Sequence, residues 1–159
     1  MISYARAHVK DIGVGLEVLP GVVSLLEALS LRENVVVGLV TGNLEDIAWM
    51  KMEGLGIQNY FTTPNFGGFG SDHSDRGELV KIAADRATKL FPGGFDIRAH
   101  VGDTPNDIKA AEHGGALAIG VCTGIFSEEE LRQASCGDAV IIPNLTDSKA
   151  FMSLLGIKD

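Results

Sequence analysis

Apolar and polar residues follow one another along this chain in blocks that predict strands alternating with helices. Val35 to Val40 is an apolar run rich in β-branched residues, which is typical of a strand buried on both faces of a sheet. Residues 22–31 instead place their apolar side chains on one helical face. The same patterns predict helices at 22–31, 44–53, 78–91, 105–113, 127–134 and 149–155, and strands at 35–40, 60–63, 98–102, 116–121 and 139–142.

This alternation predicts an α/β fold, a doubly wound and mostly parallel sheet in a three-layer αβα core. Residues 20–159 would form the core domain, whereas residues 1–19 carry no clear pattern before the break at Pro20-Gly21. The stretch at 67–70 (Gly-Gly-Phe-Gly) is predicted to be a flexible turn. It is not a phosphate loop, because it lacks the lysine and hydroxyl residue that end that motif.

Two carboxylates follow the predicted strand at 98–102. Asp103 stands where the strand ends, and Asp107 comes about one helical turn later. Pro105 between them suits the first turn of a helix. Mg²⁺ prefers hard oxygen ligands and keeps waters that a phosphate can replace, so the two carboxylates indicate a Mg²⁺ site. The alternative is that Asp103 only caps the helix and Asp107 only complements its dipole.

A second polar junction follows the predicted strand at 35–40. Thr41, Gly42 and Asn43 place a hydroxyl, a glycine and an amide directly before a helix, where backbone N–H groups also favour an anion. The alternative is that Asn43 is an N-cap and Gly42 a turn residue. Because ligands bind beyond the carboxyl ends of parallel strands, Thr41 and Asp103 are expected to face one pocket. Together the junctions indicate a Mg²⁺-assisted phosphate site.

The composition excludes some kinds of binding partner and indicates a cellular compartment. The net charge of −8 and the isoelectric point near 4.9 argue against nucleic-acid binding. We find no apolar run long enough to span a membrane, and the N-terminus lacks the layout of a secretory signal. Cys122 and Cys136 lie outside any Cys-x-x-Cys pattern and are expected to be reduced, in a cytoplasmic protein. The four histidines share no metal-ligand spacing and are expected to be structural or exposed.

The two junctions resemble motifs of the haloacid dehalogenase superfamily, and within it the phosphoglycolate-phosphatase-like branch. The segment from Leu39 to Asn43 looks like the second motif, whose hydroxyl residue binds the transferring phosphoryl group. The segment from Gly102 to Asp107 looks like the acidic fourth motif, which holds Mg²⁺. The resemblance runs from about Leu19 to the C-terminus. It implies Mg²⁺-dependent hydrolysis of a phosphate monoester through an aspartyl-phosphate.

The resemblance also implies one Lys or Arg as a third motif. Arg76, just before the helix predicted to begin at Glu78, is favoured over Lys81, because a guanidinium fork suits phosphate oxygens. The alternative is that Arg76 is a solvated residue at a helix start. By resemblance, Thr41, Gly42, Asn43 and Arg76 would bind phosphate, Thr41 and Arg76 would be the catalytic residues that the chain retains, and Asp103 and Asp107 would bind the metal.

The chain departs from the family at its first motif, a strand ending in Asp-x-Asp that supplies the nucleophile and the general acid/base. No Asp-x-Asp occurs in the sequence; Asp11 follows no apolar strand and Asp96 lies in a glycine-rich turn. The resemblance places the missing strand in the middle of the sheet, between the strands that end at Thr41 and Asp103. It makes residues 1–19 a remnant of the cap or of the cap-to-core connection. The sheet is therefore expected to be incomplete at its central strand.

A sheet that lacks its central strand is destabilised, because each unpaired buried backbone group costs about 1–3 kcal/mol. Several such groups exceed the stability of a whole domain, about 5–15 kcal/mol. The gap would be closed by sequence upstream of Met1, by direct pairing of the flanking strands, or by a strand of another chain, which includes self-association. The expected protein is thus a phosphatase core for a small phosphorylated metabolite that is inactive alone. The alternative is a non-catalytic fragment or regulatory module that keeps an anion and metal pocket.

Overall fold

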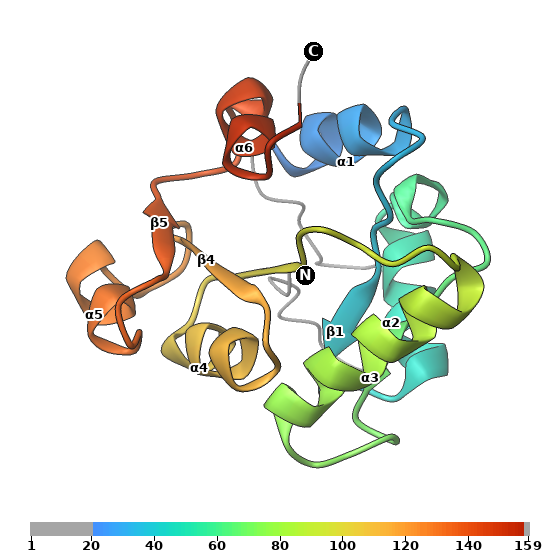
Figure 1. Cartoon of the computed structure of the whole chain (residues 1–159), viewed down its shortest axis with the longest axis horizontal. Coiled ribbons are helices and arrows are strands. Elements are labelled where there is room, and N and C mark those ends of the chain that lie inside the picture. The colour runs from blue at the N-terminus through green and yellow to red at the C-terminus, as the bar shows by residue number, and fades with distance from the viewer. Residues whose placement is uncertain (1–20, 158–159) are drawn as a thin grey trace.

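Helices and strands alternate through the computed structural model, which describes residues 21–157 (Figure 1). The predicted cap remnant at residues 1–19, with Asp11, lies outside this described part. In chain order the elements are α1 (Val22–Ser30), β1 (Leu39–Thr41), α2 (Glu45–Gly54), the 3₁₀ helix η1 (Gln58–Tyr60), β2 (Gly67–Phe69), α3 (Arg76–Leu90), β3 (Ala99–Gly102), α4 (Pro105–His113), β4 (Leu117–Val121), α5 (Glu128–Gln133), β5 (Val140–Ile142) and α6 (Ser148–Leu154).

The strands form two separate parallel groups. β1 pairs with β2, and β3, β4 and β5 pair in that order, every pair being parallel. Figure 1 shows β1 beside α2 and α3, and β4 and β5 beside α4 and α5. Within residues 21–157, β1 and β3 do not pair with each other, so direct closure of the gap is wrong for this part of the chain. The parallel α/β fold and the incomplete sheet are both confirmed.

Helices cover both faces of the strands. Leu39 of β1 belongs to a buried cluster with Leu25 of α1 and Phe151 of α6, and α1 and α6 lie against each other. Its neighbour Val40 faces the other way, because side chains alternate along a strand, and packs in a cluster with Leu79 of α3. This gives the predicted αβα layering. No helix in the described residues has the length and apolar content needed to cross a membrane.

Two elements predicted near residue 65 are wrong. Residues 60–63 form no strand, because η1 runs into them and the Phe61 N–H donates to the Gln58 carbonyl at 3.1 Å. The predicted turn at 67–70 instead contains β2. A Cβ on Gly68 would collide with the Leu79 carbonyl of α3, so glycine lets the helix lie directly on the strand backbone. Glycines carry no alternating side chains, which is why the pattern gave no strand signal here.

The apolar run at 35–40 is only partly a strand. Its ladder to β2 begins at Leu39. Before that point, the Val37 N–H donates to Thr62 Oγ1 at 2.8 Å, and the Val37 carbonyl accepts from the Thr62 N–H at 3.1 Å. Val35 to Gly38 are half-buried, whereas the pattern predicts burial on both faces. This run borders the interruption of the sheet.

Candidate functional site

Three loops meet at the carboxyl edge of the strands, and each carries predicted site residues. Thr41 ends β1, the loop between β2 and α3 leads to Arg76, and Asp103 follows β3. The Gly70 N–H donates to the Asn43 carbonyl at 2.8 Å, which joins the first two loops. A Cβ on Gly70 would collide with the Gly42 carbonyl, so only glycine permits this approach.

Thr41 and Asn43 form a small hydrogen-bonded unit. Thr41 is buried, and its Oγ1 accepts from the backbone N–H and from Nδ2 of Asn43, both at 3.2 Å. The N-cap of α2 is Leu44, with no capping side chain, so Asn43 is not the N-cap that the alternative reading required. Because both bonds are accepted by Thr41 Oγ1, its hydroxyl proton remains available to a further acceptor.

The guanidinium of Arg76 lies between the first loop and the third. Its Nη1 is 3.2 Å from Asp107 Oδ1, and its Nη2 is 3.6 Å from where a Cβ on Gly42 would stand. Arg76 is the first residue of α3, not a residue before it, and Asp75 caps the helix. Lys81 instead contacts Glu78, its Nζ being 3.3 Å from Oε1, with both side chains partly exposed. Arg76 therefore contacts predicted site residues, and Lys81 contacts an acid of its own helix.

Asp107 is buried and makes contacts through both carboxylate oxygens. Oδ2 accepts from the backbone N–H and the hydroxyl of Thr104, at 3.2 and 2.9 Å, while the Asp107 N–H donates to Thr104 Oγ1. Thr104 is therefore the N-cap of α4, and Asp103 does not have the capping role of the alternative reading. Burial raises the pKa of Asp107, but interactions with His100 and hydrogen bonding to Thr104 outweigh it and hold this pKa at about 2.

His100 lies on β3 beneath this loop, with its Nε2 3.6 Å from Asp107 Oδ1. The side chain is buried, and burial lowers the pKa of His100 to about 4, so the ring is neutral at pH 7. Sequence analysis did not associate His100 with the site. The available signal was its position within the predicted strand that leads to Asp103.

Asp103 is half-buried beside the loop that follows β4. Its Oδ2 is 2.7 Å from where a Cβ on Gly124 would stand, so the loop passes close to the carboxylate because Gly124 has no side chain. Asp103 and Asp107 offer the hard oxygens that Mg²⁺ prefers. Among the described residues, however, no group of three or more His, Cys, Asp or Glu side chains could hold a metal ion. The residues present therefore fit part of a Mg²⁺ site.

Parallel strands covered by helices define the class of this protein, a doubly wound α/β protein, and in this class ligands bind beyond the carboxyl ends of the strands. The family model of haloacid dehalogenase-like hydrolases matches residues 3–115. The chain belongs to this family. A search of curated proteins gave no match.

Solved structures share this fold at low sequence identity. A haloacid dehalogenase-like family hydrolase from Streptococcus pneumoniae has a TM-score of 0.63 and 16% identity, over 86% of this chain and 59% of that one. A predicted phosphatase from Clostridium acetobutylicum gives 0.61 and 20%, over 86% and 59%. A protein assigned as a β-phosphoglucomutase from Thermotoga maritima gives 0.63 and 19%, over 86% and 60%. This chain thus spans less than two thirds of the length of these structures.

Proposed function

We propose that this chain supplies the phosphate- and metal-binding part of a Mg²⁺-dependent phosphatase site for a small phosphorylated metabolite. Thr41, Gly42, Asn43 and Arg76 would bind the phosphoryl group, with Thr41 and Arg76 as catalytic residues. The observation that supports this most is the Arg76 guanidinium, which contacts Asp107 and lies close to Gly42. Membership of a hydrolase family supports the type of reaction.

The groups of this chain would orient a phosphoryl group and balance its charge. Arg76 offers a planar fork of donors to two phosphoryl oxygens. The Thr41 hydroxyl, which accepts both bonds from Asn43, donates its proton to a third oxygen. Mg²⁺, held by Asp103 and Asp107, would supply further neutralisation of phosphoryl charge.

The nucleophile is the missing part. Hydrolysis through an aspartyl-phosphate needs a carboxylate in line with the leaving oxygen. The sequence contains no Asp-x-Asp, and Asp107 is engaged by Thr104 and Arg76. The chain alone is therefore proposed to bind phosphate and metal without turnover.

Calorimetry with inorganic phosphate and Mg²⁺ tests the phosphate site, with Arg76→Gln compared against Lys81→Gln as the matched control. Hydrogen bonds to charged groups contribute about 1.5–3 kcal/mol, and tenfold in affinity is about 1.4 kcal/mol. Arg76→Gln should therefore weaken phosphate binding by about tenfold or more, and Lys81→Gln should leave it unchanged. Circular dichroism checks that both variants fold. Equal affinities for wild type and Arg76→Gln would refute the assignment.

A non-catalytic anion-binding module is the second candidate. It is favoured by the ion pair between Arg76 and Asp107, which occupies a proposed metal ligand with a cation of the chain itself. This module would bind phosphate equally well with Mg²⁺ or with a chelator. The phosphatase part would bind phosphate more tightly with Mg²⁺, and the same calorimeter separates the two outcomes.

A further inference from the structure

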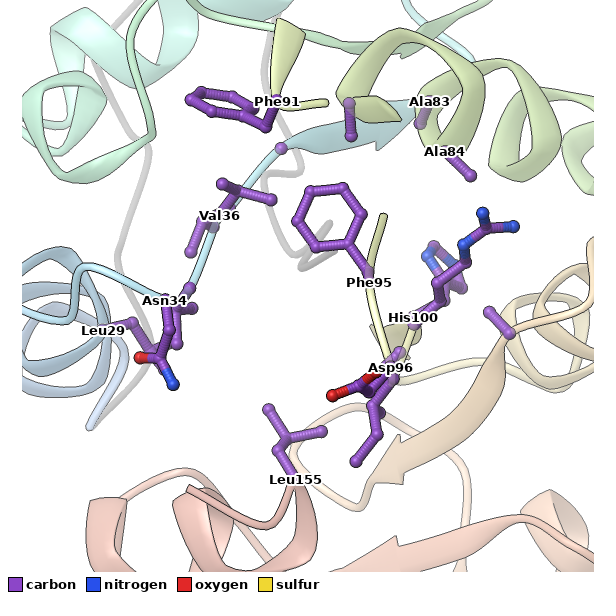
Figure 2. Close-up of a pocket in the computed structure, with 18 of the residues that line it drawn as sticks. Leu29, Asn34, Val36, Ala83, Ala84, Phe91, Phe95, Asp96, His100 and Leu155 are labelled. Atoms are coloured by element: carbon purple, nitrogen blue, oxygen red, sulfur yellow. The ribbon is translucent and has the colours of Figure 1, made fainter. Parts of the chain in front are cut away.

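Helices α3 and α4 join the two groups of strands on one face. α3 packs on β1 and β2, α4 packs on β3 and β4, and the two helices pack against each other. A cavity of about 730 Å³ lies between the strand groups, and Figure 2 shows Ala83 and Ala84 of α3 and His100 of β3 on its wall. Within residues 21–157 no strand pairing joins β1 to β3. The contact of α3 with α4 therefore helps to set how the loop after β1 lies relative to the loop after β3.

Small residues bring the two helices into close contact. A Cβ on Gly77 of α3 would collide with the ring of His113, and a Cβ on Gly114 would lie 2.6 Å from Cβ of Val80. Gly77 and Gly114 are both buried. Ala110 of α4 packs in one cluster with Val80. The end of α4 thus lies directly on the first two turns of α3.

His113, the last residue of α4, makes two contacts with the first turn of α3. Its ring lies on the backbone of Gly77, and its Nε2 is 3.2 Å from Oε1 of Glu78. A carboxylate oxygen only accepts, so Nε2 carries the hydrogen and donates it. This hydrogen bond lowers the pKa of Glu78. Since the side chains of His113 and Glu78 are 51% and 36% exposed, water competes for the bond, and the ring on buried Gly77 is the main contact.

Arg76 begins the same turn of α3, directly before Gly77. Its Nη1 is 3.2 Å from Oδ1 of Asp107, in the first turn of α4. At 1.5 Å per residue, Asp107 and His113 lie about 9 Å apart along that helix. The Arg76 side chain therefore extends from the end of α4 back toward its beginning. A rotation of the first turn of α3 would move the guanidinium away from both Asp107 and Gly42.

We propose that His113 is a positioning residue, which holds the first turn of α3 against α4 and so sets where the guanidinium of Arg76 lies in the phosphate site. His113 acts through the backbone of α3 and has no contact with phosphate in this role. The binding of phosphate by Arg76 rests on the proposed function, whereas the hold of His113 on α3 rests on helix packing, so different measurements test them.

Calorimetry with inorganic phosphate compares three variants of the 159-residue chain. His113→Ala removes both contacts and should weaken binding by about threefold to tenfold, no more than Arg76→Gln does. His113→Phe keeps a ring on Gly77 and should weaken it by less than His113→Ala. Ser135→Ala is the matched control, because the Ser135 hydroxyl donates to Oε2 of Glu112 at 2.7 Å, beside His113 but toward the loop before β5. It should leave phosphate affinity unchanged, and circular dichroism checks that all three variants fold.

A double-mutant cycle separates positioning from a general loosening of the fold. If His113 acts through Arg76, His113→Ala should cause no further loss of phosphate affinity in the Arg76→Gln background. A loss of the same size in both backgrounds would show that His113 only stabilises the fold, and would overturn the proposal.

An exchange of volume between the two helices supplies a second pair of variants. Gly77→Ala should weaken phosphate binding, because the new Cβ collides with the His113 ring and displaces the first turn of α3. Adding His113→Ala removes the ring, so the double variant should bind phosphate more tightly than Gly77→Ala alone. Losses that simply add would show that the ring does not set the place of this turn.

Nuclear magnetic resonance of the Arg76 side chain tests the positioning without a ligand. Its Nε–Hε resonance, assigned by its loss in Arg76→Gln, should move toward the position of a free arginine in His113→Ala and stay in place in Ser135→Ala. An unmoved resonance in His113→Ala, or phosphate affinity unchanged by His113→Ala while Arg76→Gln weakens it, would overturn the proposal. Phosphate affinity unchanged by Arg76→Gln would instead refute the proposed function, and the resonance would still decide the role of His113.

Discussion

Asp72 holds the loop that carries Arg76 to the site, and its replacement tests how this loop is stabilised. Its two carboxylate oxygens accept from Nη1 and Nη2 of Arg86, both at 2.8 Å, and Oδ2 also accepts from the Phe69 N–H at 3.0 Å. Arg86 Nη1 donates in addition to the Gly67 carbonyl at 2.8 Å. Asp72 thus connects β2, the loop and α3.

Two replacements separate these contacts. Asp72→Ala leaves the N–H of the fully buried Phe69 without its acceptor, which costs about 1–3 kcal/mol. The ion pair itself contributes about 0.2–1 kcal/mol, because the Arg86 side chain is 40% exposed. Asp72→Ala loses both contributions and should therefore lower the free energy of unfolding by about 1–4 kcal/mol. Asp72→Asn keeps an oxygen for the Phe69 N–H, loses only the ion pair, and should lower the free energy of unfolding by about 0.2–1 kcal/mol.

Urea unfolding followed by tryptophan fluorescence measures both values. Trp49 is the single tryptophan, and its ring lies 6.0 Å from that of Phe69, so it reports on β2. Hydrogen bonding from Arg86 lowers the pKa of Asp72 below its ordinary value of 3.8. A lowered pKa in the folded state adds stability above the unfolded pKa, and this stability is lost as pH falls through the folded value.

The extra stability of wild type relative to Asp72→Asn should accordingly be at its full value at pH 7 and should shrink as the pH is lowered below 3.8. Equal losses for Asp72→Asn and Asp72→Ala would refute the role given to the Phe69 N–H. If the difference in free energy of unfolding between wild type and Asp72→Asn stayed the same at acid pH, the stabilising role given to the ion pair would be refuted.

Three further predictions concern the site and the strand edges. Mg²⁺ should raise the melting temperature of wild type slightly, because two carboxylates make a weak site, and should raise that of Asp103→Asn less. Equal shifts for the two proteins would show that Asp103 does not bind the metal. Gly70→Ala should cost about 1–3 kcal/mol of stability and weaken phosphate binding, because its Cβ would collide with the Gly42 carbonyl; unchanged phosphate affinity would separate this contact from the site. The chain should also self-associate as its concentration rises in sedimentation, because exposed strand edges pair with other chains, and a monomer at every concentration would contradict this.

The strand–helix junctions were predictable because local chemistry determines them. Thr41 and Asp103 follow apolar runs, and both are found at strand ends beside a helix start. β2 was not predictable, because its glycines are selected by the approach of α3 rather than by alternation. The sequence did not show which residue caps α4. In the structure Thr104 is the N-cap, and Asp103 is not.

The contact between Arg76 and Asp107 depends on long-range packing. It joins the first turns of α3 and α4, which pack against each other. This packing requires Gly77, where a Cβ would collide with the ring of His113. The pattern of apolar and polar residues does not predict a contact between two helices. Nor does it predict that His100 is buried beside Asp107.

Turnover of a generic phosphate monoester with Mg²⁺ is the most direct test of the central claim, that this chain carries the accessory groups of a phosphatase and lacks the nucleophile. The 159-residue chain should show none, and a chain extended at its N-terminus by a family strand ending in Asp-x-Asp should gain activity that is lost when the first of those aspartates becomes Asn. Robust turnover by the 159-residue chain, abolished by Asp103→Asn, would contradict the account and make Asp11 the first residue to test as an unexpected nucleophile.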